Sequence, residues 1–414
     1  MKEKNQRVFI VNAKRTAIGK FLGSLYEADP AEVCAQLIRQ GFEEEKAYFK
    51  DIENVIIGNV ISAGTGQGIA RKIAVLAGVP ETVPAYTVNM VCGSGMQAIR
   101  NGVNEIRCGS NLVLCGGFEL MSNIPFATNS YIRLGKKFGD FTMTDLMTHD
   151  GLIDAFHGIH MGITAENIAR EMDITRDEQD DYSFLTQQRA IRAVDRGAFE
   201  EEIVPIRLKD YKGREYVFDK DEFPNRNSSR EKLASLKPTF IKDGSGTVTA
   251  GNSSGINDGA SFLLLASEEY CIKEKIRPMV EIVESAAVGC DPQFMGLGPY
   301  YAIKKLLEKT ELLFSQIDYL EINEAFAAQV LGCYKLLAKE YHISIEELIE
   351  RSNIYGSGLG LGHPLGATGA RITTTLAHIL KERKSGYGIA SLCIGGGMGA
   401  AVLLKGVNED AFKW

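Results

Sequence analysis

The 414-residue chain carries one strand, turn and helix pattern twice, and this repeat constrains its fold more than any other feature. The matching segments are residues 52–59 with 317–324, the turn at Cys92 with the turn at His363, and residues 114–117 with 392–396. Chance similarity between apolar strands is the plainer explanation. Three matches in the same order nevertheless favour a duplicated α/β unit.

Around these segments, apolar strand-like runs at residues 8–11, 55–58 and 112–117 alternate with helical patterns such as 31–42, which is typical of an α/β sheet covered by helices. We predict an N-terminal half over residues 1–122, completed by about 249–272, and a C-terminal half over 273–414. Residues 123–248 differ in character. They hold a polar loop at 138–150, a capping box between Thr175 and Glu178, and a hairpin formed by 204–208 and 215–218, so we expect an inserted, loop-rich substrate region.

Composition excludes several classes of protein. A formal net charge of −7, with no dense block of Lys and Arg, argues against nucleic acid as a partner. No run approaches the roughly 18 apolar residues of a membrane helix, and residues 1–7 lack the apolar core of a signal peptide. The eight cysteines form no Cys-x-x-Cys pair, which disfavours a disulfide scaffold or a zinc ribbon. We therefore expect a cytoplasmic protein with reduced thiols and no membrane partner.

Cys92 stands where an apolar run, 84–91, breaks into a Gly-Ser-Gly turn and then a helix-like stretch. The free backbone N–H groups and the positive dipole end of a helix start stabilise a thiolate, which is the nucleophilic form of cysteine. A buried structural cysteine is the commoner alternative. The position alone therefore identifies a candidate nucleophile and does not decide its role.

The duplication places the second turn, at His363, near the same axis as the first, so that Cys92 and His363 face each other. Pro364 is a good first helical residue, which puts His363 at the N-cap and favours the neutral imidazole that a base requires. A thiol beside an imidazole suits acyl transfer through a thioester, in which the cysteine attacks, the histidine moves the proton and backbone N–H groups hold the oxyanion.

Two further polar residues end apolar strands of the second half. Asn323 is followed by a helix, and capping that helix is its ordinary explanation. Cys393 precedes the glycine-rich turn 394–399 and is a candidate acid/base partner, although such a turn can simply pack a strand against a helix.

At these residues the chain resembles the thiolase family. The resemblance is carried by residues 89–95, by Asn323-Glu324-Ala325-Phe326, by Gly362-His363-Pro364-Leu365-Gly366, by 393–399, and by further matches at 15–19, 249–255 and 295–299. It implies a thiolase-like fold, with duplicated α/β half-domains, mixed five-stranded sheets, helices in layers and an inserted loop domain. It also implies a homotetramer built as a dimer of dimers.

The resemblance assigns roles to these residues. Cys92 becomes the acylated nucleophile, His363 activates it, and Asn323 holds a catalytic water in one oxyanion hole. Cys393 becomes the acid/base at the methyl carbon of acetyl-CoA, and the N–H groups of Cys92 and Gly395 form the second hole. The implied reaction is the reversible condensation of two acetyl-CoA molecules to acetoacetyl-CoA and coenzyme A. Coenzyme A is a substrate or product, and neither a prosthetic group nor a metal is expected.

The segment around His160 and Met161 resembles the short-chain branch of the family, in which Met161 and Met295 close the acyl pocket; core packing is the alternative for both methionines. The expected contacts to the substrate and coenzyme A are His160, Met161, Arg226, Phe240, Ala250, Ser254, Met295 and Phe326. The chain departs from the family pattern at Tyr355-Gly356-Ser357-Gly358. In our register Asn225 stands where the family usually has an Arg, so Arg226 replaces it.

Other interpretations remain open at this point. A longer-chain 3-oxoacyl-CoA thiolase shares the motifs, and a non-catalytic lipid carrier of the same fold would lose the reacting groups. The glycines of 358–362 allow a nucleotide-binding interpretation, but no convincing strand precedes them. Asp154, His157 and His160 allow a metal site, but they offer no defined further ligand.

Overall fold

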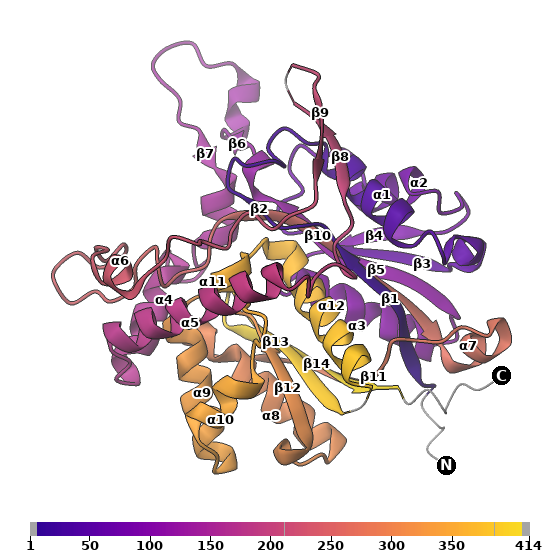
Figure 1. Cartoon of the computed structure of the whole chain (residues 1–414). Helices are drawn as coiled ribbons and strands as arrows, with labels where there is room; N and C mark the ends of the chain where they lie inside the picture. The colour runs from indigo at the N-terminus through magenta and orange to yellow at the C-terminus, as the bar shows by residue number, and fades with distance from the viewer. Residues whose placement is uncertain (1–5, 211, 385, 408–414) are drawn as a thin grey trace.

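The protein is described by a computed structural model that covers residues 6–210, 212–384 and 386–407 (Figure 1). Residues 1–5, which entered the prediction that no signal peptide is present, lie outside the described residues. A ten-stranded sheet forms the centre of the molecule, with its strands in the order β12-β13-β14-β11-β1-β10-β5-β3-β4 and with β2 paired to β10.

The N-terminal half contributes a mixed five-stranded sheet, as predicted. Its strands are β1 (Val8–Arg15), β10 (Asn257–Ser267), β5 (Leu112–Leu120), β3 (Asn54–Gly58) and β4 (Ala85–Val88), with the short β2 (Gly19–Lys20) at the side. Strand β3 runs parallel to β4 and β5, whereas β10 is antiparallel to β1 and β5. The helices of this half are α1 (Pro30–Gly41), α2 (Ile69–Leu76), α3 (Ser94–Arg107) and α7 (Glu268–Glu274).

The C-terminal half repeats this topology with four strands. They are β11 (Val280–Gly289), β14 (Met398–Gly406), β13 (Tyr387–Ile394) and β12 (Ile317–Ile322), with helices α8 (Gly298–Thr310), α9 (Ala327–Tyr341), α10 (Ile345–Arg351), α11 (Gly358–Leu361) and α12 (Leu365–Arg383). The place of the expected fifth strand is taken by an isolated parallel bridge between Leu320 and Ser352. Asn353 and Gly356 have φ angles of 48° and 76°, so the backbone leaves the extended conformation directly after the bridge.

The two halves meet edge to edge through β1 and β11, which pair antiparallel from Val8 with Ile282 to Ile10 with Val280. Four strands of each half then have counterparts across this junction: β1 corresponds to β11, β10 to β14, β5 to β13 and β3 to β12. The predicted duplication is therefore confirmed.

Helices α3 and α12 occupy corresponding positions in the two halves and pack against each other on one face of the sheet (Figure 1). The two helices approach closely near their N-terminal ends, at Gly95 and Gly369. A Cβ atom on Gly95 would lie 2.7 Å from the carbonyl oxygen of Gly366, and one on Gly369 would lie 2.5 Å from the backbone nitrogen of Met96. Helices α1 and α2 cover the other face of the N-terminal half, while α8 and α9 cover that of the C-terminal half. The inner strands are consequently apolar on both sides.

The segment between β5 and β10 contains α4 (Met161–Glu171), α5 (Arg176–Asp195), α6 (Arg230–Ala234), the pair β6 (Phe126–Ala127) and β7 (Thr144–Asp145), and the hairpin β8 (Ile206–Lys209) and β9 (Glu215–Phe218). The predicted capping box is confirmed, because Thr175 and Glu178 each accept a backbone N–H from the other. The predicted hairpin is also present. The expected polar loop at 138–150 instead holds β7 and part of a π-helix at Met147–Leu152. No helix in the described ranges is long and apolar enough to cross a membrane.

Candidate active site

A cavity of about 390 Å³ lies where both halves and the inserted segment meet. Its lining includes Cys92, His160, Met161, Phe240, Ala250, Ser254, Met295, Phe326, His363, Cys393 and Gly395. The fold thus brings together two thiols and an imidazole that are separated by up to about 300 residues in the chain. Most of the remaining lining is apolar, which is usual for a pocket that binds an organic ligand.

Cys92 lies just outside the start of α3, in a turn held by Asn89. The side chain of Asn89 accepts the backbone N–H of Val91 at 2.9 Å and donates to the carbonyl of Val60 at 2.9 Å. Burial raises the pKa of Cys92 to about 11, although the N–H groups of Gly395 and of Cys92 itself oppose this shift. Backbone N–H groups at this turn favour the thiolate, but desolvation outweighs them. The resting group is a neutral thiol.

His363 lies one residue further from its helix than predicted. Pro364 has extended backbone angles and is the N-cap, and α12 begins at Leu365. The expected neutral state nevertheless holds, since burial, with a contribution from the positive charge of Arg371, lowers the pKa of His363 to about 3. A neutral imidazole has one unprotonated nitrogen, which can accept a proton.

Two side chains hold one nitrogen of His363. Nδ1 lies 2.6 Å from Oγ1 of Thr368, and that hydroxyl also lies 2.8 Å from the carbonyl oxygen of Pro364. With Nδ1 engaged in this way, Nε2 is the nitrogen available to the cavity. The backbone N–H of His363 is held by Oδ1 of Asn257 at 3.0 Å.

Asn323 directly follows β12, whereas α9 begins at Ala327 with Phe326 at its N-cap. The capping explanation for Asn323 is therefore wrong. Its Nδ2 lies 3.4 Å from Nδ1 of His363. Its buried Oδ1 has no hydrogen-bond partner among the described residues. The side chain thus lies beside the imidazole and behind the lining of the cavity.

Cys393 is the penultimate residue of β13 and is only 1% exposed. Burial raises the pKa of its thiol well above the ordinary value, and the nearby Cys92 adds to this shift. The two thiols are therefore close enough for a charge on one to disfavour a charge on the other. Cys393 is protonated at neutral pH and has a proton to donate.

The inserted segment supplies an aromatic wall. His160 caps α4, because its Nδ1 accepts the N–H of Gly162 at 3.0 Å. Its ring stacks on that of Phe240 with the ring centroids 4.7 Å apart, and Phe240 forms a T-shaped pair with Phe326 at 6.3 Å. His157 instead bonds to Asp154 at 2.9 Å. Within the described ranges no group of three or more His, Cys, Asp or Glu side chains is arranged to hold a metal.

Family comparison agrees with this geometry. A model of the thiolase N-terminal domain matches residues 8–269, and a model of the thiolase C-terminal domain matches residues 276–406. This chain belongs to the thiolase family.

Relatives of this thiolase match it over almost its full length. Acetyl-CoA acetyltransferase of Escherichia coli is 42% identical over 400 residues, covering 96% of this chain and 99% of the relative. A probable acetyl-CoA acyltransferase of Staphylococcus aureus strain COL is 44% identical with the same coverage. The crystal structure of Bacillus anthracis acetyl-CoA acetyltransferase superposes with a TM-score of 0.91 at 42% identity, covering 97% of this chain and 98% of that one. The crystal structure of human mitochondrial 3-ketoacyl-CoA thiolase superposes with a TM-score of 0.90 at 38% identity, covering 97% of this chain and 99% of that one.

Two predicted site residues of this thiolase do not line the cavity. Asn323 lies behind His363, as described above. Arg226 is exposed elsewhere and pairs with Asp195 at 2.5 Å. The glycine run at 358–362 forms the buried helix α11. A Cβ atom on Gly358 would lie 2.5 Å from the carbonyl oxygen of Glu324, so this glycine serves close packing rather than phosphate binding.

Sequence reasoning missed several residues of the thiolase site. The additional lining includes Met121, Leu152, Phe223, Ile256 and Leu365, which are ordinary apolar residues in the sequence. It also missed Asn257 and Thr368, which hold His363. Asn257 did leave a signal, because it begins a strand that is buried throughout, and a buried amide there requires a partner.

Proposed function

We propose that this thiolase catalyses the reversible condensation of two acetyl-CoA molecules to acetoacetyl-CoA and coenzyme A through an acetyl-Cys92 intermediate. The observation that carries the proposal is the convergence of Cys92, His363 and Cys393 on one largely apolar cavity. Relatives named acetyl-CoA acetyltransferase support the choice of substrate.

The reaction is easiest to follow in the thiolytic direction. Nε2 of His363 takes the proton of Cys92 as the sulfur attacks the 3-oxo carbon of acetoacetyl-CoA. Burial raises the pKa of Cys92 and lowers that of His363, so both groups are neutral before the substrate arrives and the proton moves only as the carbon–sulfur bond forms. Asn323 helps to hold a water in the oxyanion hole beside His363.

Cleavage of the carbon–carbon bond leaves a carbanion on the departing acetyl-CoA, and the protonated thiol of Cys393 supplies its proton. The N–H groups of Gly395 and Cys92, which point toward the thiol, stabilise the oxyanion on the acetylated cysteine. Coenzyme A then gives its proton to Cys393 and attacks the acetyl group. Cys92 leaves and recovers its proton from His363, which returns every group to its starting state.

The acyl pocket is proposed to be short. Met161 and Met295 are both at least nine-tenths buried and line the cavity beside the reacting groups. His160, Phe240, Ala250, Ser254 and Phe326 are the proposed contacts to the thioester arm of coenzyme A. Arg226 lies outside the cavity, so its proposed contact is restricted to the outer part of coenzyme A. The thiolases of longer 3-oxoacyl-CoA substrates are the alternative.

The deciding experiment compares thiolysis rates for 3-oxoacyl-CoA substrates of four, six, eight and ten carbons. We expect the highest kcat/KM for acetoacetyl-CoA, because each added methylene has to displace the methionine side chains. Clearly faster cleavage of the eight-carbon substrate would contradict the short-chain assignment. No cleavage of any member of the series would contradict the proposed function itself.

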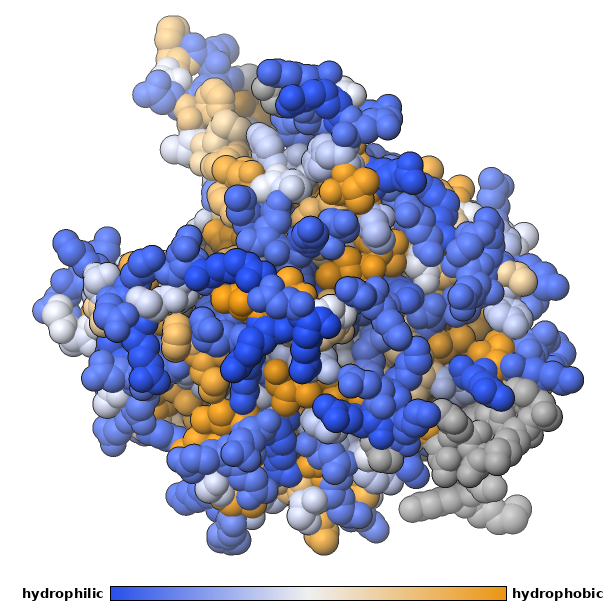
Figure 2. All heavy atoms as spheres, in the orientation of Figure 1, coloured by the Kyte–Doolittle hydropathy of each residue, from blue (hydrophilic) through white to orange (hydrophobic). Residues whose placement is uncertain are grey.

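We also propose a cytoplasmic homotetramer, built as a dimer of dimers, in which each chain divides at the boundaries expected from the sequence. The β6–β7 arm projects from the body of the molecule and carries hydrophobic residues on its surface (Figures 1 and 2). Its exposed apolar side chains are Phe126, Tyr131, Leu134, Phe138, Phe141 and Met143. Exposed apolar surface of this kind favours association between copies. Light scattering on the protein and on a Leu134→Glu, Phe138→Glu variant tests whether the arm holds the tetramer together.

A further inference from the structure

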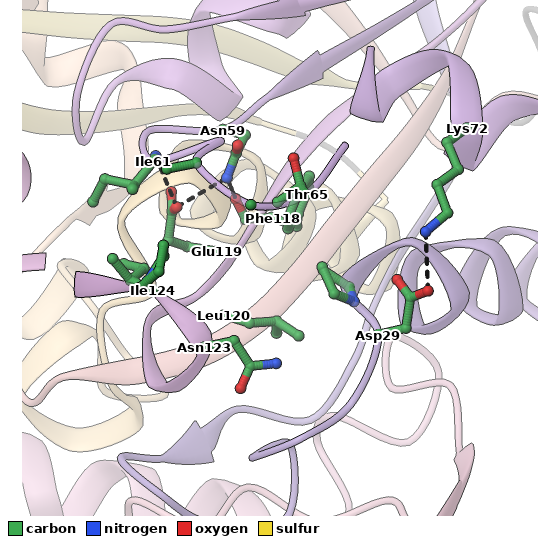
Figure 3. A pocket seen from close by; sticks show the side chains of 14 residues that line it. Asp29, Asn59, Ile61, Thr65, Lys72, Phe118, Glu119, Leu120, Asn123 and Ile124 are labelled. Carbon is green, nitrogen blue, oxygen red and sulfur yellow. Dashed lines mark hydrogen bonds and ion pairs between the residues drawn. The ribbon is translucent and has the colours of Figure 1, made fainter. Parts of the chain in front are cut away.

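A buried carboxylate lies behind the proposed catalytic turns and takes no part in the chemistry above. Glu119 is the penultimate residue of β5 and is 1% exposed. Its two oxygens accept four N–H groups: Nδ2 of Asn59 at 2.9 Å, the backbone of Ile61 at 3.1 Å, the backbone of Val60 at 2.9 Å and the backbone of Gly366 at 3.0 Å. Figure 3 shows the side chain pointing toward Asn59 and Ile61.

These bonds connect Glu119 to the turn that holds Cys92. Val60 donates its N–H to Glu119, and its carbonyl oxygen accepts a hydrogen bond from the side chain of Asn89. The same Asn89 side chain accepts the N–H of Val91, the residue before Cys92. The φ angle of Val91 is 47°. A left-handed backbone at a β-branched residue is strained and needs such support.

The fourth bond connects Glu119 to the other half of the molecule. Gly366 belongs to the first turn of α12 and follows His363 by three residues. A carboxylate at the N-terminus of a helix satisfies a free N–H group and interacts favourably with the helix dipole. One side chain is therefore the shared acceptor for the supports of Cys92 and His363.

A surface pocket of about 370 Å³ opens beside this carboxylate (Figure 3). Among the described residues that line it, the charged side chains are Asp29, Lys72 and Glu119, and the first two pair with each other at 3.0 Å. Lys72, the one cation among these lining residues, is thus paired with Asp29, and the carboxylate of Glu119 is stabilised by hydrogen bonds from N–H groups. Burial raises the pKa of Glu119 to about 7 despite these donors, so the carboxylate is ionised in mildly alkaline solution.

We infer that Glu119 is a positioning residue, whose carboxylate fixes the distance between the turn at Cys92 and the first turn of α12, which begins two residues after His363. The inference rests on the proposed thiolase function. A purely electrostatic role makes the opposite prediction, because the negative charge of Glu119 raises the pKa of Cys92. Removing that charge would then increase the reactivity of the thiol, whereas loss of positioning decreases turnover.

The test is Glu119→Gln, which keeps the shape but turns one acceptor into an NH₂ group facing N–H donors. Glu202→Gln is the matched control. Glu202 is an equally buried carboxylate that also bonds to α12, but at Thr375 in the middle of the helix, and it pairs with Arg15. Both variants lose a buried charge between the same two halves, and only the first touches the turn beside His363.

Thiolysis of acetoacetyl-CoA is measured at pH 8.5 for the wild type and both variants, together with thermal midpoints and the rate of Cys92 alkylation by iodoacetamide. We expect kcat of Glu119→Gln to fall at least 10-fold, with KM within twofold and a thermal midpoint similar to that of Glu202→Gln. A kcat within twofold of that of Glu202→Gln would overturn the inference, as would faster alkylation of Cys92 with undiminished kcat.

An inactive wild type would refute the proposed function instead, so the two failures are distinguishable. If Glu119→Gln does not fold, Asn59→Ala decides the question, because it removes one of the four donors and leaves the three backbone bonds. The inference then predicts a smaller fall in kcat, of at least threefold, again without a change in KM. An unchanged kcat in folded Asn59→Ala would refute it.

Discussion

The two halves of the molecule share one topology but surround their corresponding turns very differently. Strand β4 leads directly to Cys92, whose thiol lies in the cavity and is approached by two backbone N–H groups. The corresponding His363 is surrounded by side chains: Asn257, Thr368 and Asn323 all contact it. The shared topology thus brings both turns to one cavity, while the chemistry depends on the different side chains that each half places around its turn.

The difference extends to the missing fifth strand of the C-terminal half. Where the N-terminal half has β4, the C-terminal half has the single bridge at Ser352, and α5 of the inserted segment packs against the chain that follows. The fully buried Glu324 links α5 to the chain after the bridge. Its carboxylate accepts hydrogen bonds from the hydroxyls of Tyr182 and Thr186 on α5 and from the side-chain amide of Asn353, each at 2.8 Å. The half with four strands is therefore the half that anchors the inserted segment.

The largest expected effect comes from exchanging a cysteine in the N-terminal half. Cys92→Ala removes the proposed nucleophile and is expected to reduce thiolysis of acetoacetyl-CoA by at least about 10⁴-fold. Cys115→Ala is the control: this thiol is fully buried in β5, and its sequence counterpart in the other half is Cys393. Steady-state assays should find Cys115→Ala within a few fold of the wild type. Equal losses in the two variants would mean that packing, not nucleophilic chemistry, explains the importance of Cys92.

The second prediction tests the charge states of the two turns. Below its pKa of about 11, the thiolate fraction of Cys92 rises about tenfold for each unit by which the pH increases. Alkylation of Cys92 by iodoacetamide should therefore accelerate about 10³-fold from pH 7 to 10. His363, neutral above a pH of about 3, adds no positive charge in this range. The rates are followed by mass spectrometry of the Cys92 peptide. An alkylation rate that levels off below pH 9 would indicate a thiolate–imidazolium pair, and would contradict the neutral states of Cys92 and His363.

Much of this arrangement could be predicted from the sequence, because apolar runs reveal strands and because the turns at Cys92, His363 and Cys393 keep a recognisable order. The energetic balance could not be predicted. Helix-start position favours a Cys92 thiolate, but the burial that reverses this preference depends on side chains such as Met161 and Phe240, contributed by distant segments. The helix start at Leu365 rather than Pro364 depends equally on tertiary packing. Asn257 and Thr368 carry no motif of their own.

The third prediction separates the thiol of the C-terminal half from that of the N-terminal half. Cys393→Ala should lower thiolysis by about 10²-fold or more, the usual contribution of a general acid. Acetylation of Cys92 by acetyl-CoA should persist within about 10-fold of the wild type, because the departing coenzyme A thiolate, unlike a carbanion, can take its proton from water when Cys393 is absent. Mass spectrometry of the acetylated protein and the coupled thiolysis assay measure the two steps. Loss of acetylation in this variant would show that the departure of coenzyme A also depends on the proton of Cys393.

The smallest expected effect concerns the contact that joins the two halves at their helix starts. Gly95→Ala places a methyl group 2.7 Å from the carbonyl oxygen of Gly366 and 2.9 Å from the nitrogen of Ala370, and both atoms belong to the backbone of α12. Alanine inside a helix would otherwise gain about 1 kcal/mol over glycine, so any net loss measures the clash. We expect a loss of about 1–3 kcal/mol in the free energy of unfolding and a fall in kcat of about 10-fold, as the Cys92 and His363 turns separate. Gly289→Ala, whose Cβ would have its nearest neighbour at 3.9 Å, is the control in urea unfolding and in the thiolysis assay. Unchanged activity in a destabilised Gly95→Ala protein would show that the two helix starts tolerate separation, and that the close packing of α3 on α12 serves stability alone.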